Sequence, residues 1–107
     1  MEFELVITIV NRGFADEVMD AAREAGATGG TVLYARGTGT HEAEKFFGIT
    51  IQPEKEVVLV LANREQRNPI MKSICKDVGL NSAGHGISFS LPVDEVVGAA
   101  LLGKPCE

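Results

Sequence analysis

The sequence predicts a single α+β domain in which two helices cover one face of a four-stranded antiparallel sheet. Three observations carry this prediction. The chain has 107 residues, which is about the length of one domain. Four short runs are rich in apolar and β-branched residues, as buried strands are. Two longer segments instead repeat their apolar residues every three or four positions, which is typical of amphipathic helices.

The first half of the chain contains two predicted strands and the first predicted helix. Residues 3–10 (FELVITIV) form an apolar run without helical period, and the turn residues Asn11-Arg12-Gly13 end it. Residues 14–25 then carry the helical spacing, and Gly26 is suited to the left-handed conformation that ends a helix. Residues 31–35 (TVLYA) are predicted to form the second strand.

The third strand and the second helix follow one another closely. Residues 56–62 (EVVLVLA) form the clearest buried strand in the sequence. The start of the helix has two alternatives, because Asn63 with Gln66 resembles a capping box while Asn68-Pro69 is also a good starting pair. Pro69 deep inside a helix would lose a backbone hydrogen bond. We therefore expect either a kink or a late start.

The last part of the chain closes the sheet. Gly79 is predicted to end the second helix, residues 87–91 to form the fourth strand, and Pro92 to stop it. A short terminal helix is expected over residues 94–102, within an appendage over 93–107. The resulting strand-helix-strand-strand-helix-strand order is the ferredoxin-like βαββαβ arrangement, here in one domain over residues 1–107. The central strands are apolar on both sides, so the open sheet face needs a cover, which self-association would supply.

Composition excludes several classes of protein. The net charge is −5 and the pI is near 5.0, which disfavours non-specific binding to nucleic acid or to anionic membranes. The longest apolar runs are far shorter than the ~20 residues of a membrane-spanning helix. The start of the chain is acidic, at Glu2 and Glu4, whereas a signal peptide starts with basic residues. We expect a cytoplasmic protein without membrane insertion.

Glycine residues gather at the ends of the predicted strands. Gly26, Gly29 and Gly30 precede the second strand, Gly37 and Gly39 follow it, and Gly84 and Gly86 precede the fourth. The two G-x-G turns, one beside Arg36 and one around His85, can expose backbone N–H groups to a phosphate. They serve equally well as tight turns. Neither has the spacing of a Rossmann or P-loop site.

Other reactive residues give no catalytic constellation, so we expect no enzyme. His41, His85 and Cys106 are candidate metal ligands, but solvated histidines and an inert terminus explain them as well. Cys75 fits the core face of a helix. The carboxylates Glu42, Glu44, Glu54 and Glu56 are expected on solvated faces. The pair Phe46-Phe47 either folds into the body or anchors a partner.

From about residue 5 to residue 97 the chain resembles the P-II nitrogen regulatory protein family. The resemblance is carried by several segments in order: residues 5–10, the helix over 14–25, GATGGTVLYARGTG (26–39), the stretch from Ala62 to Gly86 ending in AGHG, and ISFSLPVDEVV (87–97). Members of the family are homotrimers that bind adenine nucleotides (ATP, ADP or AMP) between subunits. They project a long flexible loop into a target, commonly a membrane transporter or a metabolic enzyme.

The resemblance implies a site for each of these functions. The nucleotide cleft would contain Arg36, Gly37, Thr38, Gly39, Gly84, His85 and Gly86, with Phe89 nearby, and a neighbouring subunit would contribute Gly29, Gly30 and Thr31. The partner-binding loop would run from Thr40 to Pro53 and contain His41, Lys45, Phe46 and Phe47.

Several family residues are replaced in this chain. The lysine that usually follows the second G-x-G is Ile87 here, and two arginines beyond the last strand are Gly98 and Ala100. Each lost charge-assisted hydrogen bond is worth ~1.5–3 kcal/mol, which predicts weaker triphosphate binding, a ligand with fewer phosphates or a different ligand. A loop glutamine that helps to hold 2-oxoglutarate is His41. The alternative function is a trimeric metal-binding or metal-tolerance protein that uses His41, His85 or Cys106.

Overall fold

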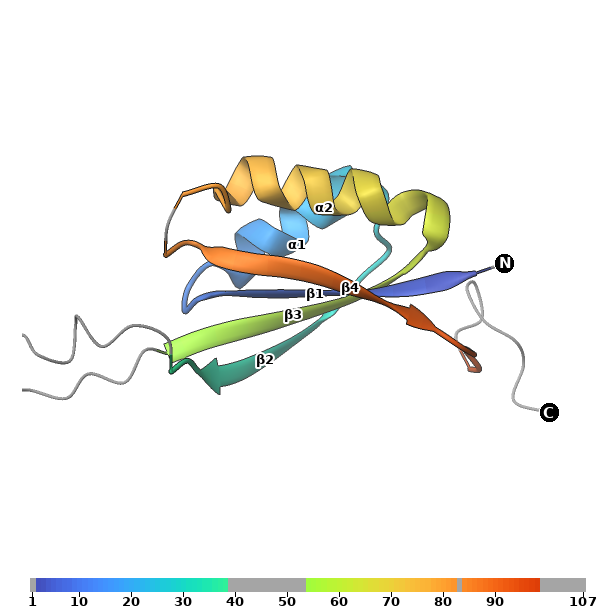
Figure 1. The fold of residues 1–107 in the computed structure, drawn as a ribbon, viewed down its shortest axis with the longest axis horizontal. Coiled ribbons are helices and arrows are strands. Elements are labelled where there is room, and N and C mark those ends of the chain that lie inside the picture. The colour runs from blue at the N-terminus through green and yellow to red at the C-terminus, as the bar shows by residue number, and fades with distance from the viewer. Residues whose placement is uncertain (1, 39–53, 83, 99–107) are drawn as a thin grey trace, which may run out of the picture.

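The computed structural model describes residues 2–38, 54–82 and 84–98. The elements in chain order are β1 (Phe3–Asn11), α1 (Ala15–Glu24), β2 (Thr31–Arg36), β3 (Glu54–Asn63), α2 (Arg64–Val78) and β4 (Gly86–Val93). The strands form one antiparallel sheet in the order β2-β3-β1-β4. Both helices lie on the same face of this sheet (Figure 1). The predicted ferredoxin-like arrangement is therefore confirmed.

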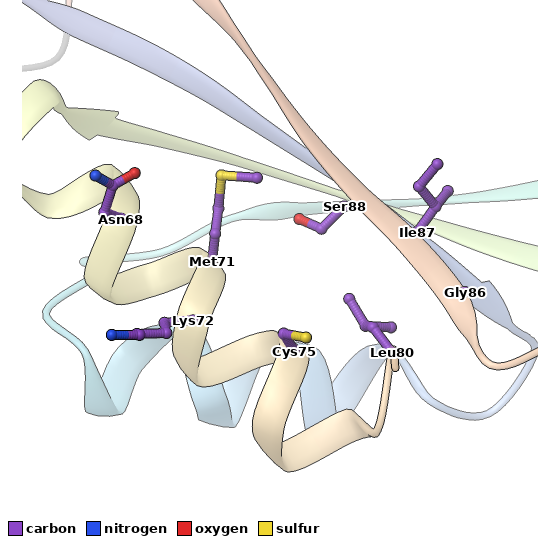
Figure 2. A pocket seen from close by; sticks show the side chains of 8 residues that line it. All are labelled: Asn68, Met71, Lys72, Cys75, Leu80, Gly86, Ile87 and Ser88. Atoms are coloured by element: carbon purple, nitrogen blue, oxygen red, sulfur yellow. The ribbon is translucent and has the colours of Figure 1, made fainter. Parts of the chain in front are cut away.

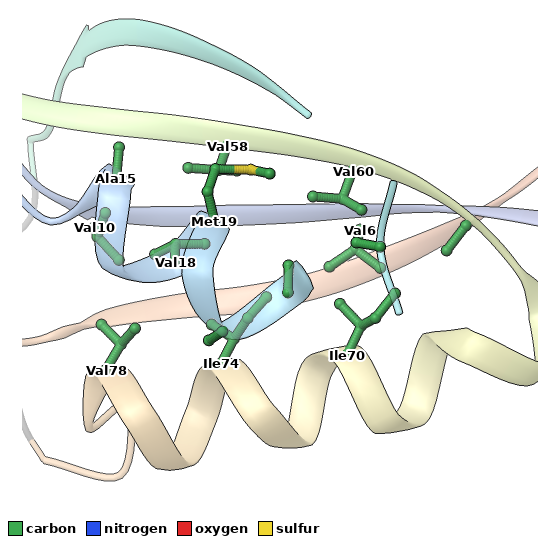
Figure 3. Close-up of a cluster of buried hydrophobic side chains, with 14 residues drawn as sticks. Val6, Val10, Ala15, Val18, Met19, Val58, Val60, Ile70, Ile74 and Val78 are labelled. Atoms are coloured by element: carbon green, nitrogen blue, oxygen red, sulfur yellow. The ribbon is translucent and has the colours of Figure 1, made fainter. Parts of the chain in front are cut away.

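The hydrophobic core lies between the helices and the two central strands. Along β1 and β3, buried and partly buried residues alternate, because successive side chains of a strand point to opposite faces. The buried set meets the apolar stripes of both helices in one cluster (Figure 3). Its most deeply buried members include Val6, Val10, Val18, Val58, Ile70 and Ile74. The even-numbered positions of β1 and β3 thus face the helices.

At the start of helix α1, a carboxylate of a sheet strand accepts hydrogen bonds from backbone N–H groups. Phe14 provides no side-chain cap. Instead, Oε1 of Glu56 in β3 accepts the N–H groups of Gly13 at 2.8 Å and of Ala15 at 3.0 Å. Glu56 is only 7% exposed, so the expectation that it lies on a solvated face is wrong. A buried carboxylate is stable here because two N–H groups bond to it.

Helix α2 begins at the earlier of its two predicted starts. Oδ1 of Asn63 accepts the N–H of Gln66 at 3.0 Å, as the N-cap of a helix does. Pro69 then lies inside the helix, so the alternative of a late start is wrong. Gly79 ends the helix in the left-handed conformation, with φ at 80°, as expected.

The end of β4 differs from the prediction. Pro92 lies within the strand, opposite Glu4 of β1, instead of stopping it. This is possible because β4 is an edge strand. Proline has no N–H to donate, but at the edge of a sheet there is no further strand that would lose a hydrogen bond. Residues 94–98 form no helix, and the rest of the predicted terminal helix lies outside the described residues. Within the described ranges, neither helix is long and apolar enough to cross a membrane.

Candidate functional site

The two predicted glycine turns lie at the same end of the sheet. Arg36, the last residue of β2, pairs with Glu54 at the start of β3. In the neighbouring pairs, Lys55 is opposite Asn11 and Val10 is opposite Gly86. Gly37 and Gly86 therefore flank one end of the sheet from its two edges, separated by three strand spacings or roughly 14 Å.

Two polar side chains fill the space between these turns. Nζ of Lys55 donates to Oδ1 of Asn11 at 2.6 Å, and Nδ2 of Asn11 donates to the carbonyl oxygen of Gly84 at 3.1 Å. The lysine stem lies against Gly37, because a Cβ built on that glycine would be 2.8 Å from Cε of Lys55. A continuous line of contacts, from Gly37 through Lys55 and Asn11 to Gly84, thus joins the turns.

Sequence reasoning missed Lys55 and Asn11 as members of this site. They are 44 residues apart and belong to different strands, so no local motif connects them. The register of the first and third strands would have placed them opposite one another. An ammonium group at this position is a cation beside both glycine turns.

The second glycine turn requires its glycines for steric reasons. Gly84 and Gly86 have φ values of 82° and 139°, a region that residues with a Cβ rarely adopt. A Cβ on Gly86 would also lie 2.5 Å from the carbonyl oxygen of Ile9. Space around Gly84 is open, with no atom within 4 Å of such a Cβ. Gly86 is therefore required by the close packing of the turn, whereas the turn is accessible from outside at Gly84.

The other predicted residues of the cleft lie around these turns. His85 is exposed and follows Gly84, while Thr38 is exposed after the end of β2. Phe89 is 37% exposed and is paired with Ile7, which places it on the sheet face away from the helices. Arg36 is exposed at the end of β2 and is engaged in interactions there.

A polar cluster surrounds the start of β3. Arg12 forms an exposed ion pair with Glu54, at 2.7 Å between Nη1 and Oε2, and its guanidinium lies 5.7 Å from the ring centre of Tyr34. The hydrogen bond from Arg12 to Glu54 raises the pKa of Arg12 further above its usual value. Successive residues 54, 55 and 56 thus bond to residues 11–15. The end of β1 is firmly attached to the start of β3.

Gly29, Gly30 and Thr31 lie at the opposite end of β2 from Gly37. The strand between them spans roughly 17 Å at ~3.3 Å per residue. Together with Val93, residues 95–97 and the leucines at positions 5, 59 and 61, they line a hollow of about 720 Å³. Gly30 is closely packed, because a Cβ there would lie 2.7 Å from Sδ of Met19 and 2.9 Å from the carbonyl oxygen of Leu59. Within one chain, these glycines do not meet the other two turns.

The sheet face that connects these two ends carries apolar side chains. In the described part of the chain, no helix lies over this face (Figure 1). The odd-numbered residues of the central strands are partly buried, and those of the edge strands are more exposed. Leu33 is 47% exposed, Ile87 57% and Leu91 48%. A continuous apolar face of this kind typically contacts another protein surface. The expectation of an apolar open face is confirmed.

A separate groove lies between α2 and the edge of β4, with a volume of about 590 Å³ (Figure 2). Met71, Leu80 and Ile87 give it apolar walls, and Lys72, Cys75 and Ser88 also line it. Cys75 is half-buried, and its Sγ lies 3.4 Å from Oδ1 of Asn81. Of the predicted cleft residues that the structure describes, only Gly86 lines this groove.

Several predicted residues lie outside the described ranges. These are Gly39, Cys106 and the whole of the predicted partner loop, including His41, Lys45, Phe46 and Phe47. Glu42 and Glu44 also lie there. Among residues 2–38, 54–82 and 84–98, no three His, Cys, Asp or Glu side chains are grouped closely enough to hold a metal ion. His85 therefore has no set of partner ligands within those ranges.

Comparison with known proteins identifies the family. The crystal structure of PII from Arabidopsis thaliana bound to citrate superposes with a TM-score of 0.71, at 23% sequence identity, over 91% of this chain and 80% of that one. This likeness shows a shared fold. No curated protein sequence matches the chain. The family model for nitrogen regulatory protein P-II matches residues 3–99. The chain therefore belongs to the P-II nitrogen regulatory protein family.

Proposed function

We propose that the protein is a homotrimeric regulator, without enzymatic activity of its own, that binds an adenine nucleotide in clefts between subunits. In this proposal, nucleotide binding changes the affinity of the loop over residues 40–53 for a target protein, such as a membrane transporter or a metabolic enzyme. The protein would act in the cytoplasm. Membership of the P-II family supports each part of the proposal.

The position of the two glycine-rich ends carries this proposal. The turns at Gly37 and Gly84 lie at one end of the uncovered apolar face, while Gly29–Thr31 and the hollow beside them lie at the other. A cyclic, head-to-tail assembly sets one end of a subunit against the opposite end of the next. It would combine the two halves into one cleft and also bury the apolar face.

The chemistry of the first half favours an anionic ligand. Glycine turns leave backbone N–H groups accessible, and Lys55 places an ammonium group between the turns. The Arabidopsis relative was crystallised with citrate, which is itself a multiply charged anion. Ile87 adds no positive charge, although it is 57% exposed beside the second turn. We therefore expect AMP or ADP to bind at least as tightly as ATP.

Titration calorimetry with ATP, ADP and AMP, each with and without Mg²⁺, tests the proposal. We expect at least one nucleotide to bind at one site per subunit. Lys55→Met should weaken the binding about tenfold or more, because one charge-assisted interaction with the ligand is lost. The matched control is Lys76→Met, which removes an exposed lysine of α2 that lies beside Glu24 and Ala25 at the end of α1. Absence of binding by all three nucleotides would refute the nucleotide part of the proposal.

A further inference from the structure

We propose that Asn11 is a positioning residue that couples Lys55, at the start of β3, to the turn at Gly84–Gly86. The regulatory meaning of this coupling rests on the proposed function, in which both groups belong to the nucleotide cleft and Lys55 follows the partner-binding loop. The coupling itself is a property of the hydrogen bonds around one side chain.

The Asn11 amide is held from both of its ends. Its oxygen accepts from Nζ of Lys55 at 2.6 Å, and its nitrogen donates to the carbonyl oxygen of Gly84 at 3.1 Å. An amide is planar and carries its acceptor and donors on one rigid group. A rotation that follows Lys55 therefore moves the donor away from Gly84, and a movement of Gly84 changes the position of the acceptor.

The group that responds to this movement of Asn11 is the peptide between Gly84 and His85. Its carbonyl accepts from Asn11, and its N–H donates to the carbonyl oxygen of Ser82 at 3.3 Å. Gly84 has a φ of 82°, so the turn is in a conformation that L residues rarely adopt. Loss of the Asn11 hydrogen bond removes one of the two hydrogen bonds that hold this peptide. The peptide can then rotate more easily, which changes the N–H groups that face a bound anion.

Among the first three residues of β3, Lys55 has the side chain that can most easily change its position. Glu54 is paired with Arg12, and Glu56 caps α1 from a buried position. Both neighbours are thus bonded to the β1–α1 region, whereas Lys55 is partly exposed and its stem contacts Gly37. An anion that attracts the Lys55 ammonium would weaken its bond to Asn11. By linkage, the state of the turn would influence Lys55 to the same extent.

A double-mutant cycle on the ligand-free protein tests the coupling. Amide hydrogen exchange at Gly84, His85 and Gly86 would be measured by NMR in the wild type, Lys55→Met, Asn11→Ala and the double variant. We expect Lys55→Met to change the exchange rate of His85 about threefold or more when Asn11 is present, above the roughly twofold deviation of independent sites. In the Asn11→Ala background, we expect the same substitution to have no effect beyond that deviation.

Two further variants separate coupling from a general loss of structure. Asn11→Asp keeps an acceptor for Lys55 but loses the donor to Gly84, so the effect of Lys55→Met on His85 should disappear in this background as well. Glu54→Gln alters the neighbouring residue and should leave His85 exchange unchanged. Circular dichroism and urea unfolding would establish that each variant is folded.

The cycle requires no ligand, so its result is independent of the calorimetry. Equal effects of Lys55→Met with and without Asn11, or no effect in either background, would overturn the coupling even if nucleotides bind. Conversely, a coupling that depends on Asn11 would stand even if no nucleotide binds, and only the proposed function would then fail.

Discussion

Glu56 and Ala15 are joined by a buried hydrogen bond of 3.0 Å between the carboxylate of a central strand and the first backbone N–H of α1. The same oxygen also accepts from Gly13, at 2.8 Å. The helix is thus capped by a residue 41 positions away in the sequence. The N–H of Ala15 is one of the N-terminal groups that have no partner within a helix, and Gly13 lies just before the helix, so the capping couples the start of α1 to the sheet.

Replacement of Glu56 tests this capping. Glu56→Ala leaves buried N–H groups without an acceptor, and we expect it to lower the free energy of unfolding by ~1–3 kcal/mol. Urea denaturation followed by circular dichroism would measure the change. Glu56→Gln retains an acceptor oxygen and should cost less. In contrast, Glu54→Ala removes only an exposed ion pair and should cost at most ~1 kcal/mol. Equal losses in Glu54→Ala and Glu56→Ala would contradict the capping role.

The glycines of the proposed cleft should differ in their tolerance of alanine. Gly86→Ala combines a positive φ with a contact of 2.5 Å to a backbone oxygen, so we expect it to destabilise the protein by about 2 kcal/mol or more. Gly29→Ala meets no atom within 4 Å and should change stability by at most ~0.5 kcal/mol. Thermal unfolding would measure both variants.

Gly29→Ala also separates a structural from a ligand-binding role. If Gly29 contributes to the cleft of a neighbouring subunit, the variant should be stable and yet bind nucleotide more weakly in calorimetry. Unchanged affinity in the stable variant would exclude close approach of the ligand to Gly29.

The apolar sheet face provides a test of the assembly. Leu91→Asp introduces a charge on this face, where Leu91 is 48% exposed in a single chain. Because burial of an unpaired charge is costly, we expect the proposed trimer to dissociate or to become much less stable. Light scattering coupled to gel filtration would give the mass. Lys76→Asp changes the charge of an exposed position on α2 and should leave the mass unchanged. A wild-type protein with the mass of a monomer would refute the trimer.

A gain of function is expected at Ile87. By the resemblance to the family, this residue would occupy the place of a lysine beside the second glycine turn, and at 57% exposure it has room for a longer side chain. Ile87→Lys should tighten ATP binding about tenfold or more, because a charge-assisted interaction is gained. Ile87→Met, of similar length without charge, should have no such effect. Calorimetry with ATP and AMP would show whether the gain depends on the number of phosphates.

The sequence predicts the strands and helices well because each has a local signal. The apolar runs of β1 and β3, the glycine after α1 and the Asn63–Gln66 pair are each signals within a few residues of the sequence. The position of Pro69 inside α2 was less predictable. Helix propensity predicts that a proline here lowers the stability of the helix. The burial of Ile70 and Ile74 offsets this loss, but it depends on the completed fold.

Some features of the fold escaped prediction because the partners of the residues concerned are distant in the chain. Glu4 is buried beside Arg67, with 3.0 Å between Oε1 and Nη1, although the two are 63 residues apart. Glu56 is buried for a similar reason. A carboxylate in a strand gives no sign in the sequence of whether a donor will face it. The sequence identifies the glycine turns of the candidate site, but the line from Lys55 through Asn11 to Gly84 requires the strand register.

Pairing of Arg36 with Glu54 also has an evolutionary consequence. The chain leaves the sheet at one of these residues and returns at the other, so both ends of the intervening stretch are fixed at neighbouring positions. Since the cost of closing such a stretch rises only slowly with its length, insertions, deletions and exchanges are tolerated there. Related proteins can thus vary the sequence at this position without redesign of the scaffold. The same property makes it a suitable place to graft a foreign epitope.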